Sequence, residues 1–182
     1  MQRRTCIGCR KRQKKTSMIP LGLRPGGSLI LAPKTATSRA WICARQPCFE
    51  SVSARPSTLS RAFKQRVALP EDWLIQVSSV QANRLKPLLL RAHRSGQVIT
   101  GRTQVIDQLP ALIGVLFSED AGAGSRAEVS NSNSQTLRLT IPISTAQIGQ
   151  LLRCGPRSVL GLRPGRMTQS LLTSLQGWDR LG

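Results

Sequence analysis

Four cysteines stand in two short pairs, and their spacing suggests a specific chemistry. Cys6 and Cys9 are separated by two residues; after a gap of 33 residues come Cys43 and Cys48, which are separated by four. Four thiolates carried by two such turns can close a tetrahedral zinc site. The alternative is that they are small buried side chains in a core that folds without metal. Cys154 lies far along the chain without a partner, and we expect it to be a buried hydrophobe.

Basic residues surround the first cysteine pair. The chain carries a net charge of +19, and residues 1–70 hold fifteen Lys and Arg against a single acid, Glu50. Charges at this density repel one another unless a polyanion neutralises them, which favours RNA, DNA or an anionic membrane over a basic face that only aids solubility. With three Phe, three Trp and no Tyr, base stacking is not expected to dominate. We predict that phosphates of RNA are contacted by Arg3, Arg4, Arg10, Lys11, Arg12, Lys14 and Lys15, helped by Arg39, Arg61 and Lys64.

The first 70 residues are expected to form a small β-hairpin-plus-helices module. Residues 1–17 read as a loop or knuckle. Strands are predicted at 18–23 and 28–31 around a Pro-Gly-Gly turn, with a third strand or a lead-in to the second cysteine turn at 40–43. A polar loop is expected at 33–38. Helices are predicted at 48–52, after Pro47, and at 58–66 with Ser57 as its N-cap.

This first half resembles the YlxR family of small bacterial proteins. The resemblance rests on Arg4–Arg10 (RTCIGCR), Arg39–Cys43 (RAWIC), Cys48 and Leu59–Phe63 (LSRAF). It covers about residues 3–66. The resemblance implies an α/β RNA-binding module and an association with ribonuclease P RNA and its modulation.

The second half, residues 78–182, is expected to be a three-layer α/β/α domain. Helices are predicted at 80–94, 102–109, 145–152 and 164–175, and strands at 111–117, 137–141 and 158–162. Residues 97–100 are expected to be a short link and 121–135 a flexible Gly-, Ser- and Asn-rich loop. The chain as a whole is therefore predicted to be a two-module α/β protein.

The second half resembles the ribosomal-protein family that binds kink-turn RNA, in its YlxQ-like branch. The resemblance rests on Leu89–Gly101, Phe117–Ala121, Ile148–Leu152 and Arg157–Val159. It implies an RNA contact at the start of the helix after Gly101, where Gly101 and Arg102 would meet the backbone and Gln104 would hydrogen-bond. A scaffold domain that has lost RNA reading is the alternative, since Asp107 stands where the family carries a lysine.

The sequence predicts a non-catalytic, cytoplasmic RNA-binding protein. His93, the single histidine, has no nucleophile or acid motif near it, and Glu119 with Asp120 reads as a solvated pair rather than a Mg²⁺ site. No secretory signal or membrane-length apolar run is present, so we expect no membrane partner. Zinc is the candidate cofactor, and ribonuclease P RNA or ribosomal RNA the candidate partner. The alternative is a zinc-ribbon-type transcription accessory protein; the sequence leaves the oligomeric state open.

Overall fold

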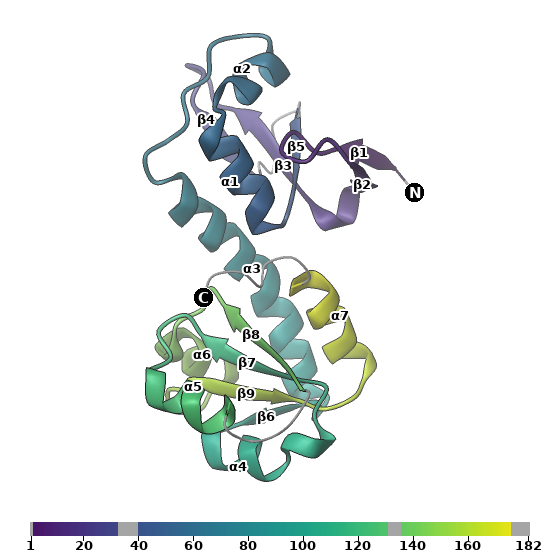
Figure 1. Ribbon diagram of the computed structural model, residues 1–182, viewed down its shortest axis with the longest axis vertical. Helices are drawn as coiled ribbons and strands as arrows, with labels where there is room; N and C mark the ends of the chain where they lie inside the picture. Colours follow the sequence, from purple (N-terminus) through teal and green to yellow (C-terminus); the bar gives the residue numbers. More distant parts are fainter. Residues whose placement is uncertain (1, 33–39, 131–135, 176–182) are drawn as a thin grey trace. The chain divides into compact units, whose positions relative to one another are not determined.

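The computed structural model describes residues 2–32, 40–130 and 136–175, and the chain divides into two compact units, Met1–Gln81 and Ala82–Gly182 (Figure 1). The division falls inside helix α3 (Trp73–Arg94), later than the predicted ranges 1–70 and 78–182. Trp73 accounts for this difference. Its side chain is buried and its ring meets the ring of Phe49 edge-on at 5.9 Å, so the first turns of α3 belong to the core of unit 1.

Unit 1 contains two small antiparallel sheets. Strands β1 (Arg3–Thr5) and β2 (Arg12–Lys14) pair with each other, and β3 (Met18–Leu23) is the centre of a sheet ordered β4 (Leu29–Leu31), β3, β5 (Ala40–Cys43). The predicted hairpin and third strand are confirmed. The prediction of a loop over 1–17 is wrong, since β1 and β2 form there. Both strands are almost wholly exposed and show no alternation of apolar and polar residues, so no pattern in the sequence indicated them.

The helices of unit 1 pack on the larger sheet. These are α1 (Gln46–Ala54) and α2 (Ser57–Phe63), which both contact β5. The 3₁₀ turn η1 (Lys15–Ser17) connects β2 to β3 along the chain. Helix α2 ends earlier than predicted, because Lys64 adopts the left-handed conformation with φ 56° and closes it. Its N-cap is Pro56 rather than Ser57. The predicted polar loop at 33–38 lies outside the described residues, as does Arg39.

Unit 2 is built on a four-stranded mixed sheet. The strand order is β6 (Val98–Thr100), β9 (Val159–Leu162), β7 (Gly114–Ser118), β8 (Leu137–Ile141); β7 and β8 are parallel and the other pairs antiparallel. Its further helices are α4 (Arg102–Asp107), η2 (Leu109–Ala111), α5 (Ala123–Ser130), α6 (Thr145–Leu152) and α7 (Arg166–Leu175).

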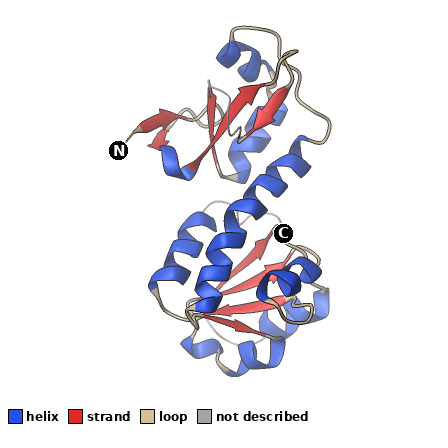
Figure 2. Cartoon of the chain, turned by 180° about the vertical axis from the view of Figure 1, so that it is seen from behind, coloured by secondary structure: helices blue, strands red, loops and turns tan. Residues whose placement is uncertain are grey.

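Two apolar clusters lie on the two faces of this sheet. One face carries Leu116 and Leu160 and packs against α3, α6 and α7; the other carries Val115 and Phe117 and packs against α4 and α5. Helices α3 and α7 lie side by side against the first face (Figures 1 and 2). The three-layer prediction is confirmed.

Two predictions in unit 2 are wrong. Residues 98–100 form a strand instead of part of a link, and residues 123–130 of the predicted flexible loop form α5, held by the fully buried Val129. Residues 131–135 of that loop lie outside the described residues. No helix in the described part of the chain combines the length and apolarity needed to cross a membrane.

Candidate metal centre and basic surface

The four cysteines predicted as metal ligands come together in unit 1. The sulfurs of Cys6, Cys9, Cys43 and Cys48 all lie within 4.8 Å of one another, and the Cys9 and Cys43 sulfurs are 3.9 Å apart. Cys9 is exposed and the other three are buried. The cluster therefore sits under the surface with one ligand at its rim. Cys154 is half-buried in unit 2 and takes no part in it.

The first pair forms a tight turn between β1 and β2. The Cys6 N–H donates to the Lys11 carbonyl at 3.0 Å, and the Arg10 N–H donates to the Cys6 carbonyl at 2.9 Å. The Cys6 sulfur accepts from the backbone N–H of Cys43 at 3.2 Å and from that of Cys9 at 3.5 Å. Backbone donors aimed at sulfur favour the thiolate, which is the form that binds metal.

Gly8 lets this turn approach the second pair. A Cβ at Gly8 would lie 2.6 Å from the Cys48 carbonyl oxygen and 3.0 Å from both the Cα and the Cβ of Cys48. Only a residue without a side chain fits between the two turns.

The second pair joins a strand to a helix. Cys43 ends β5, the Arg45 N–H donates to its carbonyl at 2.8 Å, and Cys48 lies in the first turn of α1. The four-residue spacing is wider than that of the first pair because the chain must turn from the strand into the helix before Cys48 can point back.

Hydrogen bonds among the thiols lower the pKa of one cysteine and, together with burial, raise the pKa values of two others. Bonds from Cys43 and then Cys48 to the Cys6 sulfur lower the pKa of Cys6 strongly. The bond with Cys48 pulls the pKa of Cys43 down, but the bond to Cys6, burial and the charges of neighbouring thiolates outweigh it and raise that pKa to about 12. The bonds of Cys48 to Cys43 and Cys6, with burial, raise the pKa of Cys48. Cys6, Cys9, Cys43 and Cys48 would hold a metal ion as thiolates, so its binding would require Cys43 and Cys48 to give up their protons.

The cysteine cluster fits a tetrahedral metal ion. Zn–S bonds of about 2.3 Å in a tetrahedron place sulfurs about 3.8 Å apart, close to the 3.9 Å between Cys9 and Cys43. Four sulfur donors from two turns would leave no ligand position open. This donor set is typical of a structural zinc site rather than a catalytic one.

The predicted phosphate contacts of the first unit lie on its surface around this centre. All the described side chains among them are exposed: Arg3, Arg4, Arg10, Lys11, Arg12, Lys14, Lys15, Arg61 and Lys64. Two lie over the half-buried ring of Trp41, with Arg4 6.0 Å and Lys15 5.3 Å from its centroid. Trp41 thereby holds two cations in place.

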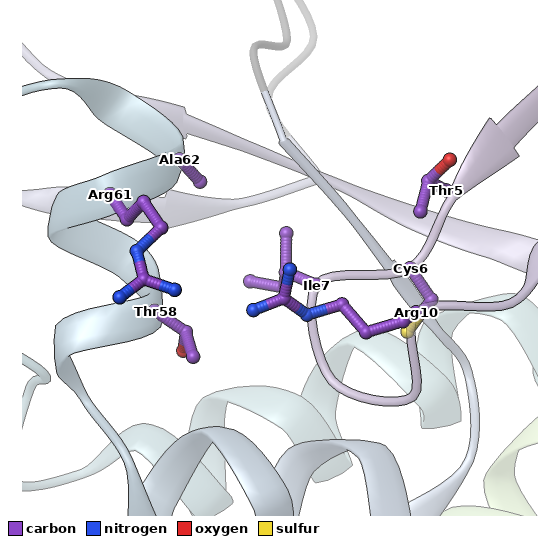
Figure 3. Close-up of a pocket in the computed structure, with 7 residues that line it drawn as sticks. All are labelled: Thr5, Cys6, Ile7, Arg10, Thr58, Arg61 and Ala62. Carbon is purple, nitrogen blue, oxygen red and sulfur yellow. The ribbon is translucent and has the colours of Figure 1, made fainter.

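Arg10 and Arg61 meet at one pocket. The pocket has a volume of about 190 Å³ and is lined by Thr5, Cys6, Ile7, Arg10, Thr58, Arg61 and Ala62. The two guanidinium groups extend into it from opposite sides, one from the cysteine turn and the other from α2 (Figure 3). No acidic residue lines it.

The residues predicted to contact RNA in unit 2 lie at the start of α4. Gly101 has φ 102° and precedes the helix, and Gln104 is exposed. Arg102 forms an ion pair with Glu128 of α5, 3.0 Å between Nε and Oε2. RNA contact by these three residues stays a prediction, and Arg102 would have to leave Glu128 to make it.

The sequence interpretation overlooked several residues that shape the site. Gly8 and Trp41 entered the prediction only as parts of motifs. No local sequence pattern predicts the pocket, which is lined by Thr5, Ile7, Thr58 and Ala62 beside the two arginines and Cys6. The spacing of Gly8 between two cysteines was a usable signal for a tight turn.

Comparison with known proteins assigns the chain to no family. No protein-family model matches the chain, and no curated protein is similar to it. Among solved structures, a protein with unknown function from Bacillus halodurans C is 22% identical, with a TM-score of 0.46 over 50% of this chain and 96% of that chain. The resemblances to the YlxR and YlxQ-like families remain predictions.

Proposed function

We propose that the protein binds structured RNA through the basic surface of unit 1 and catalyses no reaction. The observation that carries this proposal is the charge of that unit: Met1–Gln81 contain fifteen Lys and Arg against Glu50, Glu71 and Asp72. The nine described cations named above are all exposed, seven of them within residues 3–15 and two, Arg61 and Lys64, at α2. A surface of this kind attracts phosphates, and the repulsion among its positive charges is relieved when a polyanion binds.

We propose that Zn²⁺ is held by Cys6, Cys9, Cys43 and Cys48. When bound, zinc would tie the β1–β2 turn to the β5–α1 turn and so keep Arg10 and Lys11 in position. The proposal places the protein in a reducing compartment, the bacterial cytoplasm, where thiols stay available as ligands.

Unit 2 would add orientation on a folded RNA. Here the proposal rests on the resemblance to kink-turn binders, and the resemblance of unit 1 to YlxR proteins favours ribonuclease P RNA or ribosomal RNA as the target. Crosslinking in the producing cells followed by sequencing of the bound RNA tests this. Enrichment of one structured RNA is expected; a diffuse spread across all RNAs would contradict a dedicated target.

Charge reversal at the turn tests the proposed surface. We expect Arg10→Glu with Lys11→Glu to weaken RNA binding and to reduce the slope of log affinity against log salt by about 1.5, since each of the two lost phosphate contacts removes about 0.7–0.9. Fluorescence anisotropy with a structured RNA at several salt concentrations measures both. Arg24→Glu with Arg66→Glu is the matched control, because it changes the net charge equally at two other exposed positions of unit 1. Equal affinity in the Arg10/Lys11 variant and the unaltered protein would refute the proposed surface.

The four-cysteine cluster also suits the alternative, a zinc-ribbon-type transcription accessory protein. Competition separates the two: duplex DNA should displace bound RNA poorly if the RNA proposal holds. Displacement by duplex DNA at equal nucleotide concentration would favour the alternative.

A further inference from the structure

Two of the exposed arginines, Arg10 and Arg61, face each other at the pocket between the cysteine turn and α2. Arg10 is fixed there by its backbone: its N–H bonds to the Cys6 carbonyl, and its φ of 61° is left-handed. Arg61 is fixed by α2, whose Leu59 and Phe63 are buried in the core. Neither guanidinium has an ion-pair partner within the described residues.

Two cations that converge without a carboxylate repel each other, so the arrangement is favourable only when an anion lies between them. Guanidinium groups match phosphate oxygens in forked, charge-assisted hydrogen bonds. The side chains of Ile7 and Ala62 line the same pocket, so part of its wall is apolar and offers a bound anion no competing acceptor. The hydroxyl proton of Thr58 is already donated to the Arg55 carbonyl at 2.8 Å, so recognition falls to the arginines.

The volume of the pocket limits the size of the group that can bind in it. The pocket measures about 190 Å³, which is below the roughly 300–1,000 Å³ of sites that enclose a whole small molecule. It therefore suits a single anionic group and leaves the rest of the ligand outside.

We propose that Arg10 and Arg61 together bind one phosphate group of the RNA in this pocket. The inference rests on the proposed function and deepens it: most of the basic surface attracts RNA diffusely, whereas this pair holds one phosphate by geometry. The phosphate can be an internal diester or a 5′-terminal monoester, and the chemistry of the two guanidinium groups is the same for both.

The test uses the full-length, zinc-loaded protein and one RNA oligonucleotide, with and without a 5′-phosphate, at fixed salt. Arg61→Lys keeps the charge but loses the fork, and we expect it to weaken binding about tenfold. Arg66→Lys, the same change at an exposed position outside the pocket, is expected to leave affinity unchanged. Circular dichroism and zinc content check that each variant is folded.

Coupling between the two arginines gives a second readout. If both hold one phosphate, Arg10→Gln and Arg61→Gln each remove most of the effect, and the double variant loses little beyond either single variant. A loss confined to the 5′-phosphorylated RNA would identify a terminal phosphate, and an equal loss with both RNAs an internal one; either supports the pocket. Equal affinity of Arg61→Lys and Arg66→Lys, or strictly additive losses, would overturn it while leaving RNA binding intact.

Inorganic phosphate separates failure of the pocket from failure of the proposed function. Broadening of the ³¹P resonance of inorganic phosphate by the protein, abolished by Arg61→Gln but not by Arg66→Gln, would support the pocket even if no RNA bound. If RNA binds but the Arg61 and Arg66 variants behave alike in both the RNA and the ³¹P assay, the proposed RNA binding is supported and the phosphate pocket is refuted.

Discussion

At the scale of single residues, Gly8 decides whether the two cysteine turns can meet. A Cβ at this position would press on the backbone of Cys48, which cannot rotate away as a long side chain could. We expect Gly8→Ala to destabilise unit 1 by about 1–3 kcal/mol and to weaken zinc binding. Thermal unfolding and zinc competition with a chromophoric chelator measure the two effects. Gly122→Ala, with open space around it, is the control; equal behaviour of the two variants would disprove the close packing.

Asp120 is a second residue whose role the structure defines. Its Oδ1 accepts hydrogen bonds from the backbone N–H and the hydroxyl of Thr145, at 2.8 and 2.7 Å, at the start of α6. The hydroxyl of Thr145, and after it the backbone bond, lowers the pKa of Asp120. The carboxylate of Asp120 therefore caps the start of α6, which gives this residue a structural role.

A lowered pKa sets the direction of the pH dependence. The stabilisation by Asp120 is fully present above the unfolded-state pKa and is lost as the pH falls through the lower folded-state pKa. We expect Asp120→Ala to cost about 0.5–1 kcal/mol at neutral pH, at the modest end because the group is exposed, and almost nothing in strong acid. Urea unfolding at both pH values tests this, with Glu119→Ala as the control. A cost independent of pH would contradict the charged cap.

At the scale of elements, α5 is a helix in a segment whose composition predicts a loop. Its sequence, AGSRAEVS, is typical of a loop, yet Val129 is fully buried in the cluster with Val105 and Phe117. Arg126 adds hydrogen bonds to the Ala121 and Ser118 carbonyls and lies over the ring of Phe117. Val129 and Arg126 are therefore two of the residues that hold this helix on the sheet, beside the ion pair of Glu128 with Arg102.

Truncation of Val129 tests whether this segment is packed. We expect Val129→Ala to destabilise unit 2 by about 2 kcal/mol, since it removes buried methyl groups and leaves a small cavity. Ser130→Ala, an exposed neighbour, should change the free energy of unfolding by less than about 0.5 kcal/mol. If Val129→Ala is equally silent in chemical denaturation, residues 123–130 behave as the flexible loop that the sequence suggested.

At the scale of the whole molecule, the two units differ in charge and in cysteine content. Unit 2 has apolar clusters on both faces of its sheet. Unit 1 is small, highly charged, and places three of its four clustered cysteines in the core. Zinc bound to these cysteines would therefore add a constraint to the core of unit 1 and to no residue of unit 2.

Removal of metal should therefore affect one unit only. We expect a strong chelator to collapse the dispersed amide resonances of unit 1 while those of unit 2 remain, in ¹H–¹⁵N spectra of the full chain. Cys9→Ser should reproduce the effect, and Cys154→Ser, outside the cluster, should not. Unchanged spectra after complete removal of metal would show that the cysteines are core residues of a unit that folds without it.

Local patterns in the sequence were sufficient for much of this fold. The alternation in Leu137–Ile141 and the apolar run before Ser118 predicted strands, and residues 145–152 were predicted to be helical; the structure confirms these elements. Each of these signals comes from residues adjacent in the chain, where side-chain period and capping chemistry act directly. The cysteine spacing likewise predicted four sulfurs that do come together.

Tertiary structure alone decided the rest. The exposed strands β1 and β2 carry no apolar period, α5 forms because Val129 finds a core, and Trp73 extends unit 1 into α3. The pocket of Arg10 and Arg61 arises where the cysteine turn folds back beside α2. These features depend on contacts between residues that are distant in sequence. Such contacts produce no local periodicity of apolar residues, so the sequence alone does not predict them.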